Sequence, residues 1–128
     1  MKRGGILHPG LSHLLASTGH TDFFTICDRG FPVPEGPERI DLALTDDIPT
    51  VLDVISAVAA EWSIDRVLIA HEMDEISPRR VAQLQLLVPD VPLERVSHVQ
   101  LKRLALNARA TVRTADTVPY SNLIVVSG

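Results

Sequence analysis

The fold class of this chain is decided by residues 23–34, which read FFTICDRGFPVP. Residues 23–27 form a short apolar run with aromatic and β-branched members, and one glycine and two prolines close it. An apolar run of this length between chain-breaking residues predicts a strand that is buried on both faces of a sheet. Asp28 therefore lies at the carboxyl end of a predicted strand, where open α/β sheets usually bind their ligands.

Strands and helices alternate on both sides of this run. Upstream, leucines at helical spacing over residues 11–15 predict a helix, and Gly19 is placed to end it, so that His20 enters the following loop. Downstream, residues 40–45 alternate between apolar and polar side chains, as in a half-buried strand. Further strands are predicted at residues 67–70, 111–114 and 123–126, and further helices at residues 48–62, 77–88 and 97–104. This order predicts a single domain, residues 1–128, of the α/β class, built as a layered sandwich with a mixed sheet.

The composition of the chain limits its partners. Its 128 residues are 45% apolar and 22% charged, which is ordinary for a globular protein. A count of 12 Lys and Arg against 16 Asp and Glu gives a formal net charge of −4, so neither nucleic acid nor an anionic membrane is expected as a partner. Gly4 and Gly5 interrupt any leader-like run after Lys2 and Arg3. Cys27 is the only cysteine, which excludes an intrachain disulfide, and we expect a cytoplasmic protein.

His20 and Asp28 are the first candidates for chemistry. His20 precedes the buried strand and Asp28 follows it, and the two can approach each other if the loop folds back over the edge of the sheet. A histidine paired with a carboxylate supplies a proton donor and a proton acceptor near neutral pH. The alternative is a surface histidine and an aspartate that caps a turn, since both are common in loops.

His98 and Lys102 form a second candidate pair. Ser97, followed by Gln100 three residues later, has the pattern of a capping box and predicts a helix that starts at Ser97. On that helix His98 and Lys102 are four residues apart and share one face, where they offer hydrogen-bond donors to a polyhydroxyl ligand. The alternative is a solvated helix face.

Tyr120, Ser121 and Asn122 form a third group, at the entry to the last predicted strand. Their hydroxyl and amide groups suit the recognition of sugar hydroxyls, and the alternative is an ordinary turn after Pro119. Asp28 ends its strand, whereas Tyr120 and Asn122 begin theirs. These side chains meet only if the last strand runs antiparallel to the first, or if they come from different subunits.

The other motifs of the sequence do not match common metal or cofactor sites. His71-Glu72 lacks the second histidine of a zinc-binding helix, so we expect these residues to line the site or to satisfy loop backbone. Cys27 lies inside an apolar run and is expected to be a neutral buried thiol rather than a nucleophile. The sequence contains no glycine-rich phosphate loop and no dinucleotide fingerprint.

Several stretches, taken in order, carry a family resemblance. They are GHTD (19–22), CDRGFPVP (27–34), RIDLALT (39–45), IP (48–49), SH (97–98) with Lys102, and PYSNLI (119–124). Together they resemble the D-ribose pyranase family, whose sister group is L-fucose mutarotase, and the resemblance covers essentially the whole chain. The Pro-Val-Pro segment and the RIDLAL strand are closer to the ribose branch.

The resemblance implies a three-layer α/β/α sandwich and a homo-oligomer of stacked rings, such as a decamer, with sites at the subunit interfaces. It implies that the protein interconverts β-D-ribopyranose and β-D-ribofuranose without a metal or an organic cofactor. His20 matches the proton donor of the family. The positions that match its substrate-binding residues are Asp28, His98, Lys102, Tyr120, Ser121 and Asn122.

Arg29 departs from the family pattern, because a small residue is expected after the aspartate. Its guanidinium suits a phosphate or a carboxylate if the side chain points into the site. We expect it to point outward, since alternation along the strand sends it to the face opposite Asp28. The alternatives to a ribose pyranase are a mutarotase for another sugar, such as fucose or an anionic sugar, and a non-catalytic sugar-binding subunit that partners a transporter or a kinase.

The sequence also predicts that activity does not depend on a metal ion, because the histidines lack metal-ligand spacing. Treatment with excess EDTA, followed by transfer into metal-free buffer, is expected to leave the rate of sugar exchange measured by NMR unchanged. Activity that is lost to the chelator and restored by zinc or manganese would contradict this prediction.

Overall fold

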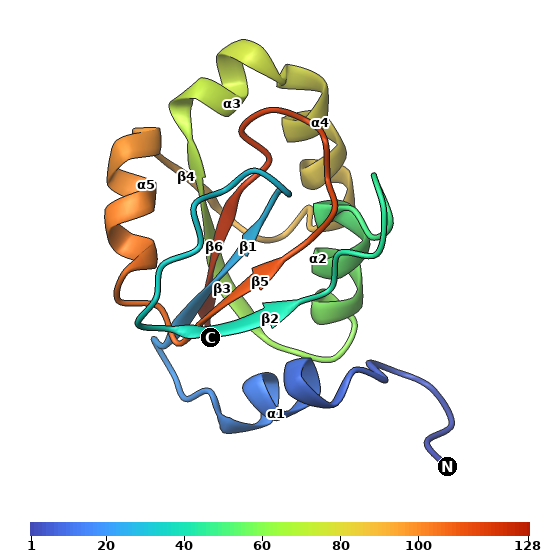
Figure 1. The fold of residues 1–128 in the computed structure, drawn as a ribbon. Coiled ribbons are helices and arrows are strands. Elements are labelled where there is room, and N and C mark those ends of the chain that lie inside the picture. The colour runs from blue at the N-terminus through green and yellow to red at the C-terminus, as the bar shows by residue number, and fades with distance from the viewer.

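The computed structural model describes residues 1–128 and contains one six-stranded sheet (Figure 1). In spatial order the strands are β2 (Glu38–Asp41), β5 (Ala110–Arg113), β1 (Phe23–Cys27), β6 (Leu123–Ser127), β3 (Ile64–Ala70) and β4 (Leu93–Val96). β6 runs antiparallel to both of its neighbours, β1 and β3, whereas all other neighbouring strands are parallel. The predicted mixed sheet is confirmed.

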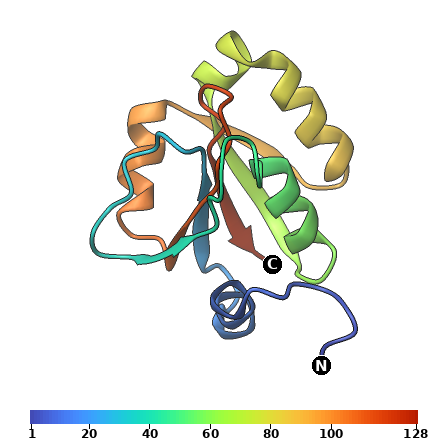
Figure 2. The same cartoon turned by 45° about the vertical axis from the view of Figure 1, so that its right-hand side comes forward.

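Helices cover both faces of this sheet. They are α1 (Pro9–Ser17), α2 (Val51–Ala59), α3 (His71–Ile76), α4 (Pro78–Leu87) and α5 (His98–Ala105). Figure 2 shows α5 on one face of the sheet and α2 with α4 on the other, so that the molecule has three layers. The larger core lies on the side of α2 and α4 and includes Phe24, Ile55 and Leu84, and the smaller core lies under α5 and includes Leu101 and Ile124. None of these helices has the length and apolar character needed to cross a bilayer.

Several local features differ from the prediction: α3 was not predicted, and the strand expected at residues 40–45 is β2, which ends at Asp41. β4 follows two prolines and has a mixed polar sequence, so no apolar run marks it. It forms because its backbone pairs in parallel with the long strand β3. The helix predicted at residues 48–62 is α2, which begins only at Val51, because its N-cap is Thr50, which forms a capping box with Asp53. Asp47 accepts hydrogen bonds from the backbone and the hydroxyl of Thr117.

The position of β6 brings together two segments that are far apart in the sequence. In its register with β1, Leu123 is opposite Ile26 and Val126 is opposite Phe23. The start of β6 therefore lies beside the end of β1, within one subunit. Of the two arrangements that the sequence left open, the antiparallel one is correct.

Candidate functional site

A cavity of about 260 Å³ lies where β1 ends and β6 begins. The side chains around it come from the end of β1, the loop after it, the first turn of α5 and the loop before β6. Its lining residues are Asp28, Gly30, Phe31, Pro32, His98, Pro119, Tyr120 and Asn122. Four of the predicted site residues, Asp28, His98, Tyr120 and Asn122, thus lie around one cavity.

Asp28 is held from two sides at the end of β1. Its backbone N–H donates to Oδ1 of Asn122 at 2.9 Å, and its own Oδ1 accepts a hydrogen bond from the N–H of Gly30 at 2.9 Å. Burial raises the pKa of Asp28 above its usual value, although hydrogen bonds from the Gly30 N–H and the Asn122 side chain act in the opposite direction. A raised pKa makes the Asp28 carboxylate a stronger base, which suits a proton acceptor.

His98 is the first residue of α5 and forms the opposite wall. Its ring packs edge-on against Tyr120, with centroids 5.0 Å apart, and against Phe31 at 6.2 Å. Burial and then the charge of Lys102 lower the pKa of His98, while Glu72 and Asp28 act in the opposite direction. A lowered pKa favours the neutral imidazole, which carries one donor and one acceptor. Its buried Nδ1 has no hydrogen-bond partner, which is unusual for a buried polar atom.

Glu72 fixes the backbone at the start of α5. Both of its carboxylate oxygens accept from the N–H of His98, at 3.0 and 3.2 Å, and Ser97 accepts the N–H of Gln100 as predicted. Glu72 therefore satisfies loop backbone, which is one of the two roles that the sequence suggested. An anion at the first turn is also favoured by the helix dipole.

The loop before β6 has a strained backbone at the site. Tyr120 has φ = 59°, in the left-handed region that a residue with a Cβ rarely occupies. Such a conformation typically costs about 1–3 kcal/mol and persists only where the surrounding structure enforces it. Asn122 is buried beside it, and its N–H donates to the carbonyl of Tyr120 at 2.8 Å. The strain therefore lies next to two of the side chains that line the cavity.

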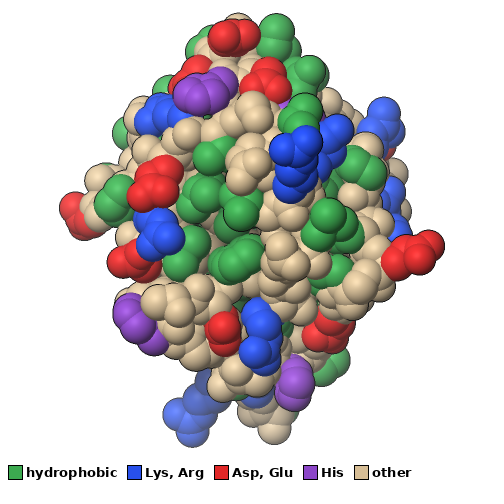
Figure 3. All heavy atoms as spheres, turned by 90° about the vertical axis from the view of Figure 1, so that its left-hand side faces the viewer, with side chains coloured by type: hydrophobic (Ala, Val, Ile, Leu, Met, Phe, Trp, Pro, Cys, Tyr) green, Lys and Arg blue, Asp and Glu red, His purple; other side chains and the backbone are tan.

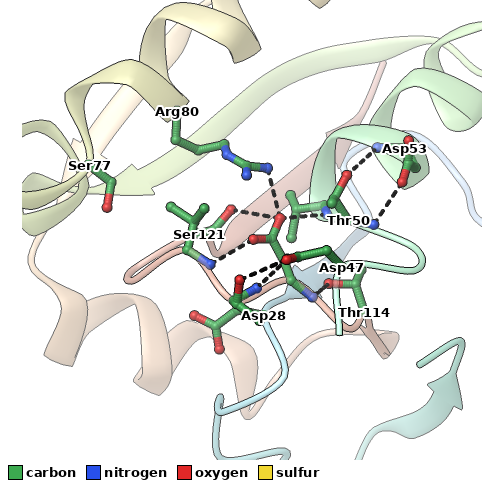
Figure 4. A network of polar contacts seen from close by, with 12 residues as sticks. Asp28, Asp47, Thr50, Asp53, Ser77, Arg80, Thr114 and Ser121 are labelled. Carbon is green, nitrogen blue, oxygen red and sulfur yellow. Dashed lines mark hydrogen bonds and ion pairs between the residues drawn. The ribbon is translucent and has the colours of Figure 1, made fainter. Parts of the chain in front are cut away.

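Lys102 and Ser121 do not line this cavity. Lys102 is one helical turn beyond His98 and lines an adjoining hollow of about 440 Å³, which shares Pro32 with the cavity. Ser121 is fully buried, and its hydroxyl is 3.4 Å from the carboxylate of Asp116 (Figure 4). The prediction that Ser121 faces the sugar is not supported by this placement, because the loop turns its side chain inward.

His20 lies at the far end of β1 from Asp28. The N–H of the next residue, Thr21, bonds to the carbonyl of Ser127 at the end of β6, whereas Asp28 bonds to Asn122 at its start. The five residues of β1 between them span about 17 Å at the usual rise of a strand. The loop therefore does not fold back over the edge of the sheet, and His20 does not approach Asp28 within one subunit, because an extended strand separates the two residues.

Arg29 points away from the cavity, as predicted. Its guanidinium is about half exposed and forms an ion pair with Asp46 at 2.6 Å. It lines a separate hollow with Arg113 and residues 43–46. β1 ends at Cys27, so Arg29 lies in the turn that follows, and this turn and the ion pair set its direction rather than the predicted strand alternation.

The site also contains residues that the sequence did not reveal. Phe31 supplies an apolar wall, and Asp116 lies buried behind the loop. Phe31 belongs to the stretch that defines the fold, but nothing in the pattern shows that its ring meets His98. Asp116 follows two small residues and has no motif around it, so only its contacts identify it.

The cavity combines a carboxyl group of raised pKa, a histidine of lowered pKa, a tyrosine and a buried amide. These groups can accept and donate protons and can hydrogen-bond to several hydroxyls of a small polar ligand. No group of three or more His, Cys, Asp or Glu side chains is arranged to hold a metal ion.

Comparisons with known proteins agree with this geometry. The chain is 43% identical to the D-ribose pyranase of Coprothermobacter proteolyticus and 44% identical to that of Chloroflexus aggregans, each over 128 residues that cover 100% of this chain and 98% of the relative. The structure of Bacillus subtilis RbsD complexed with D-ribose matches with a TM-score of 0.95 at 36% identity, and covers 100% of this chain and 98% of that one.

A more distant match shows how widely the fold is shared. The fucose mutarotase of Streptococcus pneumoniae in complex with L-fucose matches with a TM-score of 0.82 at 14% identity, over 95% of this chain and 93% of that one. The model of the RbsD / FucU transport protein family matches residues 1–128. The chain belongs to the RbsD/FucU family.

Proposed function

We propose that this protein is a D-ribose pyranase that interconverts β-D-ribopyranose and β-D-ribofuranose in the cytoplasm. The observation that carries this proposal is the cavity in which Asp28, His98 and Asn122 meet, in a chain that matches curated D-ribose pyranases over its full length. The cavity is polar and small, which suits a monosaccharide. Free D-ribose is the substrate that the names of these relatives favour.

The reaction needs two proton transfers. One group takes the proton of the anomeric hydroxyl while another protonates the ring oxygen, which opens the ring to the aldehyde. Rotation about a carbon–carbon bond then presents a different hydroxyl to the carbonyl, and the same groups act in reverse to close the new ring. General acid–base catalysis of this kind typically contributes about 10²–10⁴-fold.

We assign the two proton transfers to Asp28 and His20. Asp28 accepts the anomeric proton, since its raised pKa suits an acid–base role. His20 protonates the ring oxygen, because it matches the proton donor of the family. Within the cavity, His98, Tyr120 and Asn122 bind the sugar hydroxyls, and Lys102 borders the entrance.

His20 reaches the cavity in this proposal only from a second copy of the chain. It lies about the length of β1 from Asp28 of its own subunit. Figure 3 shows apolar side chains gathered in the middle of the face that α5 covers. Val99 and Leu106 are more than half exposed there, beside the hollow next to the cavity. Such a patch fits an interface between copies, in a homo-oligomer of stacked rings such as a decamer.

The function is tested by saturation transfer in NMR between the pyranose and furanose signals of ribose. A ribose pyranase transfers saturation at substoichiometric protein concentration. A non-catalytic binding subunit, which is the alternative that the transport-protein name of the family suggests, does not transfer saturation. Parallel measurements with L-fucose distinguish a mutarotase for another sugar. Exchange of fucose without exchange of ribose would overturn the proposed substrate.

Replacement of His20 by alanine (His20→Ala) is expected to remove most of the ribose exchange while the fold is retained. His20 is exposed and forms no side-chain hydrogen bond in the subunit, so its loss leaves the core intact. The exchange rate measured by NMR checks the loss of activity, and the circular dichroism spectrum checks that the fold is retained. His13→Ala, at another exposed histidine, is the control. A folded variant with wild-type exchange would exclude His20 from the mechanism.

Light scattering on an active preparation is expected to report a mass several times that of one 14.0 kDa subunit. The reason is that one subunit does not bring His20 and Asp28 together. As a further check, a mixture of inactive His20→Ala and inactive Asp28→Asn proteins should regain exchange after subunits are shuffled, since some sites then hold both native residues. A mass of one subunit in the active protein would refute this assembly.

Arg29→Ala is expected to leave both ribose exchange and the binding of ribose 5-phosphate within about twofold of wild type, since an exposed ion pair contributes little. Titration of the sugar phosphate by calorimetry measures the binding. Lys102→Ala, at the edge of the cavity, is the matched control with the same loss of charge. A selective loss of phosphate binding in Arg29→Ala would show that an anionic sugar, not free ribose, is the substrate.

A further inference from the structure

An ion pair between Arg80 and Asp116 is buried behind the cavity (Figure 4). Nη1 of Arg80 on α4 donates to Oδ2 of Asp116 at 2.7 Å, and the two side chains are 9% and 0% exposed. Neither residue lines the sugar cavity. A buried ion pair is a poor way to stabilise a core, because desolvation offsets most of its attraction. A role other than stability is therefore needed to explain why this ion pair lies behind the cavity.

Asp116 joins four parts of the structure. Its Oδ2 also accepts from the N–H of Val51 at the start of α2, at 2.9 Å, and its Oδ1 accepts from the N–H of Val118 at 2.9 Å. Its backbone carbonyl accepts from the N–H of Arg29, next to Asp28, at 3.1 Å. The hydroxyl of Ser121 also donates to Oδ2 of Asp116, at 3.4 Å. The carboxylate of Asp116 thus ties the loop before β6 to α2 and α4, and the backbone carbonyl of the same residue ties it to the end of β1.

A second bond from the same helical region holds the loop one residue before Tyr120. Ser77, the N-cap of α4, donates its hydroxyl to the carbonyl of Pro119 at 2.6 Å. Tyr120 follows with its positive φ, and its ring lies 5.0 Å from that of His98. A strained conformation persists only when its surroundings enforce it. Asp116 and Ser77 bind the residues on either side of this strain.

We propose that Asp116 and Arg80, with Ser77, are positioning residues that hold residues 116–122 so that Tyr120 and Asn122 face the sugar. Asp116 supplies the acceptors for the loop, and Arg80 neutralises and orients Asp116. Ser77 fixes the carbonyl that precedes Tyr120. None of the three touches the substrate. The proposal rests on the proposed function only for its kinetic readout, since the order of the loop is measurable without a sugar.

The main test is Asp116→Asn, which keeps the shape of the side chain and removes its charge. The KM for ribose is expected to rise about tenfold with a smaller change in kcat, because misplaced contacts of the loop weaken sugar binding. The low-pH limb of the rate profile is also expected to move to lower pH. The charge of Asp116 helps to raise the pKa of Asp28, so its removal leaves Asp28 ionised to lower pH. Hydrogen exchange of the Val118 and Ser121 amides is expected to become faster.

The controls separate positioning from stability. Val58→Ala truncates a fully buried side chain of α2 that does not line the cavity, and is expected to lower Tm while KM stays at the wild-type value. Arg80→Met is expected to resemble Asp116→Asn in KM and in amide exchange, and Arg80→Lys to recover part of the loss, because the cation is restored on a shorter and less directional side chain.

Every outcome of these measurements either supports or overturns the positioning role of Asp116, Arg80 and Ser77. Folded Asp116→Asn with the KM, pH profile and amide exchange of the wild type would overturn the proposal. If Asp116→Asn does not fold, Ser77→Ala gives the answer, since it removes one hydroxyl, and an unchanged KM and unchanged amide exchange there would overturn the proposal as well. If the wild-type protein does not exchange ribose, the proposed function fails, and amide exchange in the same variants still shows whether this ion pair orders the loop.

Discussion

The antiparallel pairing of β6 with β1 is the constraint on which the rest of the structure depends. Because β6 runs against its neighbours, its first residues meet the last residues of β1, and the N–H of Asp28 bonds to the Asn122 side chain. In an all-parallel sheet the same residues would lie at opposite edges. Both the position of the cavity and the identity of its lining follow from the direction of this one strand.

Partial burial shifts the pKa values of Asp28 and His98, which both line the cavity, in opposite directions. Removal from water disfavours the charged form of each, so it raises the pKa of Asp28 and lowers the pKa of His98. The carboxylate of Asp28 is therefore a stronger base than in water, which suits the acceptance of a proton. For His98 the neutral imidazole is favoured, and it carries one donor and one acceptor for the hydroxyls of a small polar ligand.

The loop before β6 shows how polar interactions set specificity where apolar packing does not. Tyr120 and Asn122 belong to a segment without regular structure, and the backbone at Tyr120 is strained. A cluster of hydrogen bonds to buried Asp116 fixes this segment. Loops that carry function need a rigid support of this kind, because their own backbone supplies little.

The sequence by itself determined the α/β class, the buried strands β1, β3 and β6, and the polar residues worth following. Those features are local: apolar runs, breakers and capping patterns depend on neighbours within a few residues. Strand direction, the missed strand β4, the separation of His20 from Asp28 and the inward turn of Ser121 were decided only by the tertiary structure. Asp116 gives the plainest case, since it resembles any loop aspartate in the sequence. Its partners come from positions 29, 51 and 80, and only the folded chain brings those groups to one residue.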